Sequence, residues 1–267
     1  MGEPAPRQLI LTLYGLYARD EHNWLAVGSV VKLMGDLGVD SPGVRSSISR
    51  LKRRGVLRPM RLDDAAGYAL SDSALDLLRE GDSRIFHRQR AVVADGWVMV
   101  VFSIPESERE KRHRLRNTLS GMGFGTAAPG VWVAPGLLHD EVARTLDRQG
   151  LAPYVDLFIA QHDGFASLPQ RVAQWWDLAA IDREYADFRD RYGGRRRRAS
   201  AVPARDAFVR YVPMLTEWRR LPYLDPGLPL ELLPKRWTGG RAAELFAALD
   251  AELRGPAHAH ALAVIHA

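Results

Sequence analysis

Hydrophobic residues recur at helical spacing near the start of the chain and predict three helices. In the first, Leu9, Leu13 and Leu16 share one face because their spacing is i, i+4, i+7. The second is expected to begin at a cap on Ser29 and to stop at Gly38. The short turn that leads from there into the third helix is typical of a helix-turn-helix.

The third helix and the segment after it extend this motif. Asp40 or Ser41 is expected to cap the helix, and Pro42 suits its first turn. The pattern then becomes strand-like and predicts a hairpin. The predicted strands are residues 56–62 and 68–70, and the predicted turn is 63–67. Such a hairpin is the wing of a winged helix-turn-helix, after which Ser71 or Asp72 caps a fourth helix.

A different pattern begins at about Trp97. The apolar run WVMVVFSI predicts a buried strand, and the next segment has its acids first and its bases last, as a helix dipole favours. The elements expected after that helix are strands near 124–126 and 130–134, a helix over 139–149 and a strand over 154–161. This β-α-β-β-α-β order predicts a ferredoxin-like domain.

The last third is predicted to be mainly helical. Its first helix has an apolar seam that is expected to pack in the core, with a contact to a second subunit as the alternative. The seam residues are Leu178, Ile181, Tyr185, Phe188 and Tyr192. We then expect a mobile loop over 193–205, a helix over 208–218 and an extended segment over 222–234. A helix over 242–253 and a weakly structured tail after Gly255 are expected to follow.

These elements predict an α+β protein with three domains. A winged helix-turn-helix occupies residues 1–88, a ferredoxin-like domain 89–165, and a helical C-terminal domain 166–267. The helical domain is the part expected to bind an effector and to dimerise.

Positive charge concentrates on the third helix and the wing. Seven bases and no acid lie between Ser41 and Leu62. In a regular helix, Val44, Ile48 and Leu51 are buried, so the opposite face can reach base edges in a major groove, where arginine suits guanine. The candidates for base contacts are Ser46, Ser49, Arg50 and Arg53. The candidates for phosphate contacts, which position a protein without specifying sequence, are Arg45, Lys52, Arg58 and Arg61. The alternative is an ordinary solvated helix face.

Composition excludes several other classes of protein. The absence of cysteine excludes disulfides, cysteine zinc sites and cysteine nucleophiles. The net charge of +5 favours a polyanionic partner. No segment approaches the ~18 apolar residues of a membrane span, and no secretory signal is evident, so a soluble cytoplasmic protein is expected. Walker A, G-x-S-x-G and H-E-x-x-H motifs are absent, and we predict no enzyme activity, cofactor or metal site.

Three stretches of the chain resemble the PaaX-like transcriptional regulators, the family of phenylacetic-acid-degradation repressors. They are GVRSSISRLKRRGVL, WVMVVFSIPESERE and DPGLPLELLPKRWTGGRAAELFAAL. The resemblance covers Gln8 to Leu253, and its most specific part is the DP-x-LP-x-x-LLP-x-x-W pattern from Asp225 to Trp237. It implies a homodimeric repressor that binds double-stranded operator DNA and is released by an aryl-acetyl-CoA thioester such as phenylacetyl-CoA.

The middle domain is also similar to the small ferredoxin-like endonuclease subunits of CRISPR adaptation. In those proteins an aspartate near the end of the first strand would hold a metal, whereas Ser103 occupies this place here. A hydroxyl is a poor substitute for a carboxylate as a magnesium ligand. A metal-dependent nuclease is therefore the weaker alternative, and a nucleic-acid-binding scaffold without effector is another.

The expected effector pocket lies in the C-terminal third, which mixes aromatic residues with bases. Aromatic rings suit an aryl group, and bases suit the phosphates of a coenzyme A thioester. The candidate residues are Trp218, Arg219, Arg220, Tyr223, Lys235, Arg236 and Trp237. The alternative is that the tryptophans belong to the core and the bases to the surface.

Overall fold

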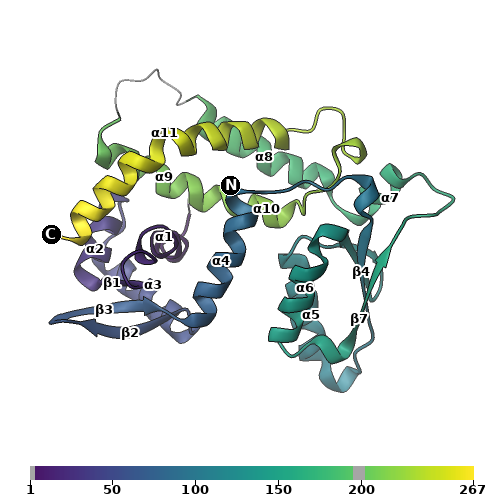
Figure 1. Ribbon diagram of the computed structural model, residues 1–267, viewed down its shortest axis with the longest axis horizontal. Helices are drawn as coiled ribbons and strands as arrows, with labels where there is room; N and C mark the ends of the chain where they lie inside the picture. Colours follow the sequence, from purple (N-terminus) through teal and green to yellow (C-terminus); the bar gives the residue numbers. More distant parts are fainter. Residues whose placement is uncertain (1–3, 195–201) are drawn as a thin grey trace. The chain divides into compact units, whose positions relative to one another are not determined.

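The computed structural model describes residues 4–194 and 202–267 (Figure 1). Packing divides the chain into two compact units. The first comprises Met1–Ile85, Ala186–Arg219 and Gly240–Ala267, and the second comprises Phe86–Tyr185 and Arg220–Gly239. The C-terminal third thus contributes to both units. The three domains expected from the sequence are each one continuous stretch of chain, whereas each of these two units combines stretches that are separated in the chain.

The first unit contains the winged helix together with C-terminal helices. Its helices are α1 (Pro6–Leu13), α2 (Val27–Asp36), α3 (Ser41–Arg53), α4 (Asp72–Phe86), the second half of α8 (Leu178–Gly193), α9 (Ala204–Trp218) and α11 (Gly239–Ile265). Its strands are β1 (Trp24–Ala26), β2 (Leu57–Leu62) and β3 (Ala65–Leu70). They form an antiparallel sheet in the order β1-β3-β2.

The helix-turn-helix forms largely as its sequence pattern predicts. The Asp40 carboxylate accepts a hydrogen bond from the Gly43 amide at 3.0 Å, which caps α3. Gly38 follows α2 with φ of +79°, a conformation that glycine adopts without strain. The cap predicted at Ser29 is wrong: α2 begins after Ala26, and Ser29 is buried inside the helix. The chain enters α2 directly from strand β1, so no separate capping turn exists.

The wing is a tighter hairpin than predicted, with an additional strand. The turn has only two residues, Asp63 and Asp64, because β3 pairs with β2 from Ala65 onward. Strand β1, which the sequence pattern did not predict, pairs with the other edge of β3. A three-residue strand is too short to show a period. The glycine at position 67 permits this pairing, since a Cβ atom there would overlap the Leu25 carbonyl oxygen and the Trp24 ring.

The second unit contains the predicted ferredoxin-like arrangement. Its elements are β4 (Trp97–Phe102), α5 (Arg109–Gly121), β5 (Gly125–Ala128), β6 (Val131–Pro135), α6 (His139–Arg148), β7 (Val155–Ala160), α7 (Leu168–Trp175), the first half of α8, and α10 (Leu221–Leu224). The antiparallel sheet has the order β5-β6-β4-β7. Helices α5 and α6 lie together on one side of it (Figure 1). Leu115, Leu119 and Val142 bury that face.

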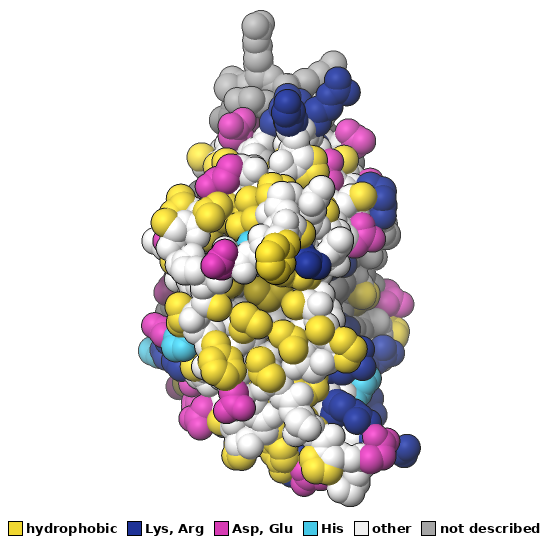
Figure 2. All heavy atoms as spheres, turned by 90° about the vertical axis from the view of Figure 1, so that its right-hand side faces the viewer, with side chains coloured by type: hydrophobic (Ala, Val, Ile, Leu, Met, Phe, Trp, Pro, Cys, Tyr) yellow, Lys and Arg dark blue, Asp and Glu magenta, His cyan; other side chains and the backbone are white. Residues whose placement is uncertain are grey.

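The opposite face of this sheet is covered only in part. Trp97 and Val133 pack against Val172 and Trp176 from the region of α7. Edge strand β7 is less covered, and Phe158 is 52% exposed there. Figure 2 shows hydrophobic side chains gathered on the side of the molecule to which β4, β7 and α7 belong.

The C-terminal segment differs from its prediction in two places. Residues 222–234 are not simply extended, because they include most of α10 and a 3-10 turn at Leu230–Leu232. The tail after Gly255 is helical rather than weakly structured, since α11 continues through Pro256 to Ile265. Pro256 has no backbone N–H and so cannot make the helical hydrogen bond to the residue four positions earlier. Two effects offset this loss: alanine has the highest helix propensity, and Ala257 and Ala261 are fully buried.

Two histidines near the end of the chain contact acids that are distant in sequence. His260 lies 2.8 Å from an Asp36 oxygen, and His266 lies 3.0 Å from a Glu21 oxygen. The sequence alone showed no acid near these histidines. The mobile loop predicted over 193–205, with its four successive arginines, falls mainly on residues 195–201, which lie outside the described residues.

Candidate nucleic-acid interface

Helix α3 separates an apolar face from a polar one. Val44, Ile48 and Leu51 are 0–3% exposed and hold the helix against the rest of the first unit. The predicted base-contacting residues Ser46, Ser49, Arg50 and Arg53 are all exposed. The structure therefore brings these four side chains together on one accessible face, as the helical spacing predicts.

Local contacts on this face are weak. One guanidinium nitrogen of Arg50 donates to the Ser46 hydroxyl at 3.3 Å, an exposed hydrogen bond one helical turn apart. Such a bond is readily exchanged for a base or phosphate acceptor, because both groups are already solvated. The polar face of α3 is thus available to a ligand.

The predicted phosphate-contacting residues flank this face. All four, Arg45, Lys52, Arg58 and Arg61, are exposed. Arg61, on strand β2, donates to the Asp64 carbonyl at 2.8 Å and so braces the turn of the wing. Two of these bases are on α3 and two on the wing, the distribution that a winged helix uses when it grips a DNA backbone on both sides of its recognition helix.

The C-terminal helices hold the helix-turn-helix in place within the first unit. Asp36, the last residue of α2, is 2.8 Å from Arg205 of α9 and 2.8 Å from His260 of α11. Burial by itself raises the pKa of this carboxyl, but hydrogen bonds from His260 and Arg205 outweigh it, so the pKa of Asp36 is lowered. The Thr216 hydroxyl of α9 also donates to Thr12 of α1 at 2.8 Å.

The predicted effector residues are divided between the two units. Trp218 and Arg219 belong to the first unit, whereas the other five belong to the second. Trp218 is 3% exposed, and its ring stacks on Phe246 with centroids 4.4 Å apart. Its indole nitrogen donates to the Ile85 carbonyl. Trp218 is therefore a core residue of its unit, as the alternative interpretation of the aromatic residues expected.

The effector candidates of the second unit are more accessible. Arg220, Lys235 and Arg236 are exposed, while Tyr223 and Trp237 are half-buried. A surface pocket lies beside this segment and includes Pro234. Its other lining residues are Ala173, Gln174, Trp175, Trp176, Asp177, Leu178, Ala179 and Asp182. The pocket offers two indoles but acids rather than bases, so a role for the candidate bases in binding phosphate stays a prediction.

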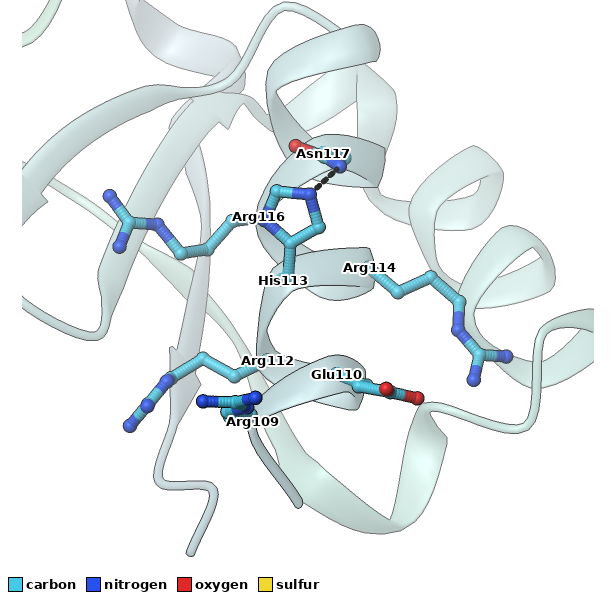
Figure 3. Close-up of a pocket in the computed structure, with 7 residues that line it drawn as sticks. All are labelled: Arg109, Glu110, Arg112, His113, Arg114, Arg116 and Asn117. Carbon is cyan, nitrogen blue, oxygen red and sulfur yellow. Dashed lines mark hydrogen bonds between the residues drawn. The ribbon is translucent and has the colours of Figure 1, made fainter. Parts of the chain in front are cut away.

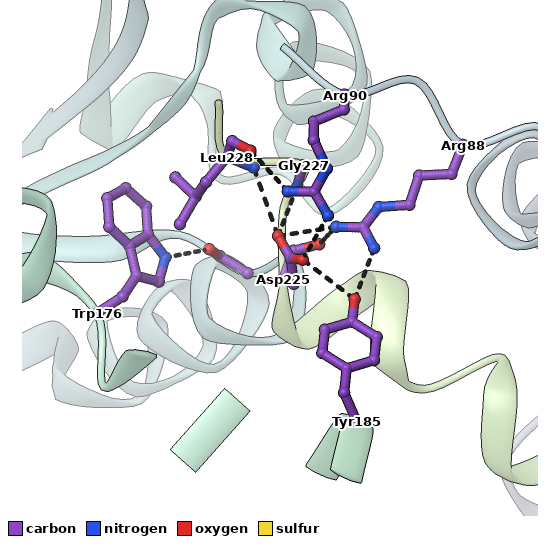
Figure 4. Close-up of polar contacts among 8 residues, drawn as sticks. Arg88, Arg90, Trp176, Tyr185, Asp225, Gly227 and Leu228 are labelled. Carbon is purple, nitrogen blue, oxygen red and sulfur yellow. Dashed lines mark hydrogen bonds and ion pairs between the residues drawn. The ribbon is translucent and has the colours of Figure 1, made fainter. Parts of the chain in front are cut away.

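A buried ionic cluster organises the motif that begins at Asp225 (Figure 4). The Asp225 side chain is fully buried and lies 2.8 Å from Arg88 and 3.1 Å from Arg90. The Tyr185 hydroxyl donates to the same carboxylate at 3.1 Å, and the Gly227 amide donates at 3.0 Å. With this many donors the hydrogen-bonding capacity of the carboxylate is satisfied. The cluster therefore has a structural role, and Asp225 has no acceptor left for a ligand.

The sequence pattern contained only part of the signal for this cluster. Asp225 stands out as an acid within an apolar, proline-rich segment, which indicates a buried and paired carboxylate. Its partners Arg88 and Arg90 precede it by more than 130 positions, so no local pattern could identify them. Burial by itself raises the pKa of Asp225, but Arg88 and Arg90 outweigh that effect and lower it.

Two features bear on the alternative functions. Ser103 follows strand β4 and is exposed. It occupies the place where the nucleases that this domain resembles would have a carboxylate. Within residues 4–194 and 202–267, no group of three or more acidic or histidine side chains is arranged to hold a metal ion. Across those same residues, no helix is both long and apolar enough to cross a membrane.

The fold and the basic face of α3 define an α+β protein with a winged helix-turn-helix and a ferredoxin-like domain. Three family models match it in chain order: "PaaX-like protein" over residues 5–74, "PaaX protein central Cas2-like domain" over 90–172, and "PaaX-like protein C-terminal domain" over 176–263. The chain belongs to the PaaX-like family, and the family resemblance inferred from its motifs is confirmed.

Two known proteins are similar over most of the chain. The "Transcriptional repressor PaaX" of Escherichia coli K12 is 29% identical over 246 residues, which are 89% of this chain and 77% of that protein. A solved structure, "Uncharacterized protein Rv0674 from Mycobacterium tuberculosis", superposes with a TM-score of 0.56 at 23% identity and covers 92% of this chain and 99% of its own. At that identity the second likeness supports the fold alone.

Proposed function

We propose that this protein is a sequence-specific DNA-binding transcriptional repressor that acts as a homodimer in the cytoplasm. Its target is an operon for the breakdown of an aromatic acid of the phenylacetate type. An aryl-acetyl-CoA thioester such as phenylacetyl-CoA releases it from the operator. In this proposal the protein binds and releases DNA and catalyses no reaction.

The observation that carries the proposal is the exposed polar face of α3. Four side chains suited to base edges lie together on a helix whose opposite face is buried, and four bases flank them. The similarity to a named transcriptional repressor over most of the chain supports the same conclusion.

Release by an effector requires that the ligand favour the state that does not bind DNA. Shifting a population from 99:1 to 1:99 takes ~5.5 kcal/mol of differential affinity. In the first unit α9 and α11 contact α1 and α2 directly, through Thr216 and His260. A ligand that displaced these helices would therefore change the position of α2 and, through it, of α3.

Binding and cleavage of duplex DNA distinguish the repressor from a nuclease. The intergenic DNA upstream of this gene and its neighbours would be labelled at both ends and incubated with the protein and magnesium. The repressor shifts one fragment intact at a salt concentration where unrelated duplex stays free. Cut fragments would establish a nuclease, and equal shifts of all fragments would establish an unspecific scaffold.

The effector proposal predicts that the thioester releases DNA and that the free acid does so poorly. The reason is that only the thioester carries phosphates for the exposed bases Lys235 and Arg236. Phenylacetyl-CoA and phenylacetate would be titrated into a preformed complex and followed by fluorescence anisotropy. The double variant Lys235→Gln/Arg236→Gln should need at least tenfold more thioester. Arg241→Gln, which changes an exposed base on α11, should respond as the unmodified protein does.

Equal release by free phenylacetate would show that the phosphates are not recognised. An unchanged response of the double variant would show that these two bases are not the ones that hold them. Either result leaves the DNA-binding part of the proposal intact.

A further inference from the structure

Helix α5 of the ferredoxin-like domain carries an excess of positive charge that does not serve to stabilise the helix. The helix contains five bases and one acid, a net charge of +4. Arg109, Arg112, His113 and Arg116 are spaced i, i+3, i+4, i+7 and so lie on one face. These four residues form the α5 stripe. In Figure 3 the arginines of the stripe extend to one side of the helix, whereas Glu110 and Arg114 extend to the other.

Helix stability does not account for the stripe. A cation at the start of a helix is disfavoured by the helix dipole, yet Arg109 is the first residue of α5. The acids that precede the helix pair with bases other than Arg109: Glu108 pairs with Lys111, and Glu106 pairs with Arg112 of the stripe. Within the described part of the chain, the guanidinium groups of Arg109 and Arg116 have no hydrogen bond or ion pair.

The ion pair between Arg112 of the stripe and Glu106 is weak. Arg112 and Glu106 are 2.5 Å apart, but the Glu106 side chain is 77% exposed. Surface pairs of this kind contribute little, because water and salt screen both charges. Arg112 can therefore exchange Glu106 for a stronger anion. His113 accepts or donates a hydrogen bond with Asn117 at 2.9 Å and completes the polar surface.

The shape of this surface favours a polymer over a small molecule. A hollow is present, but all seven residues that line it come from α5: Arg109, Glu110, Arg112, His113, Arg114, Arg116 and Asn117. A hollow between the side chains of one helix cannot surround a ligand, whereas small-molecule sites bury most of their ligand's surface. Arg109 and Arg116 are about 10 Å apart along the helix axis at 1.5 Å per residue, so they can meet separate phosphates of one backbone.

We propose that the α5 stripe is a second DNA-contacting surface, which holds backbone phosphates and adds affinity without sequence preference. This inference rests on the proposed function, since it takes duplex DNA as the polyanion that the protein binds. The physical reason is that each phosphate neutralised by an arginine releases condensed counterions. The stripe then contributes to the salt dependence of binding and leaves discrimination between sequences to α3.

The test compares two charge-matched double variants on the operator duplex. Arg109→Gln/Arg116→Gln removes the two unpaired stripe arginines, and Arg171→Gln/Arg183→Gln removes two exposed arginines from α7 and α8 as the control. Affinity for operator and random duplex would be measured by anisotropy from 50 to 300 mM potassium chloride. The stripe variant should make the negative slope of log K against log salt shallower by about 1.8 per bound chain, at ~0.9 per phosphate contact.

The control variant should keep the slope of the unmodified protein, and the stripe variant should keep its ratio of operator to random affinity. An unchanged slope in the stripe variant, or an equal fall in the control, overturns the proposal. So does a stripe variant that keeps its DNA affinity but loses release by phenylacetyl-CoA, because the stripe would then be a site for a small anion. Failure of the unmodified protein to bind any duplex would instead refute the proposed function.

Discussion

At the scale of single residues, Asp225 is a charged side chain that is completely buried in the second unit. Its carboxylate is fully buried between two arginines, a tyrosine hydroxyl and a backbone amide. Removing one partner of a buried ionic cluster leaves the others uncompensated, which costs more than the pair contributes. Arg88 and Arg90 lie in the segment that follows α4, so Asp225 fixes the path of that segment within its unit.

The substitution Asp225→Asn should destabilise the protein by about 3 to 5 kcal/mol, because Arg88 and Arg90 then lack a counterion in a buried site. The free energy of unfolding would be measured from urea titrations followed by circular dichroism. Asp156→Asn is the matched control, since Asp156 is exposed on β7 and should change stability by less than about 0.5 kcal/mol. A loss as small as that of the control would mean that the cluster is dispensable.

The same carboxylate predicts a dependence on pH. The pKa of Asp225 is lowered in the folded protein, and an unfolded aspartate has a pKa of about 3.9. Its contribution to stability is therefore full above about pH 4 and is lost as the pH falls through the lower folded pKa. The difference in stability between the unmodified protein and Asp225→Asn should shrink below pH 4. Urea midpoints from pH 7 to pH 3 measure it, and a constant difference over that range would contradict the prediction.

At the scale of elements, α3 separates two kinds of DNA contact. Arg50 and Arg53 lie on the exposed face opposite the apolar stripe, and Arg45 lies at its flank. Side chains on the exposed face can contact base edges, and side chains at its flank contact phosphates. The two classes should therefore differ in how their loss depends on DNA sequence.

Arg50→Ala or Arg53→Ala should cost about 1 to 3 kcal/mol of affinity for the operator if that arginine pairs with a guanine, and much less on random duplex. Arg45→Ala should weaken both by a similar factor. Anisotropy titrations on the two duplexes measure this, and thermal unfolding confirms the fold, because none of these side chains is buried. An equal loss on both duplexes would reassign Arg50 and Arg53 to phosphate contacts.

At the scale of the whole molecule, the homodimer is the prediction with the largest consequence. Helix-turn-helix proteins commonly bind two half-sites one helical turn apart, which requires two recognition helices. The family resemblance implies the same. Sedimentation velocity should show a species of twice 29.8 kDa, and two chains should bind each operator duplex. A monomer that binds its site one to one would contradict this.

The local sequence was sufficient for most elements of both sheets and for the exposed face of α3. Helical spacing placed Val44, Ile48 and Leu51 inward, and this alone directed Arg50 and Arg53 outward. The capping role of Asp40 and the stop at Gly38 were also local, since each depends on a few neighbouring residues. The β-α-β-β-α-β order followed from where apolar runs begin and end.

Only tertiary structure decided the rest, because the interactions concerned join residues far apart in the chain. Strand β1 exists because β3 offers it a paired edge. The end of α11 is helical because its alanines are buried and because His260 and His266 contact Asp36 and Glu21 near the start of the chain. Composition marked Trp218 as a ligand candidate, whereas packing against Phe246 made it core. Burial and long-range pairing have no local period, so the sequence by itself could determine faces and element order but not which faces meet.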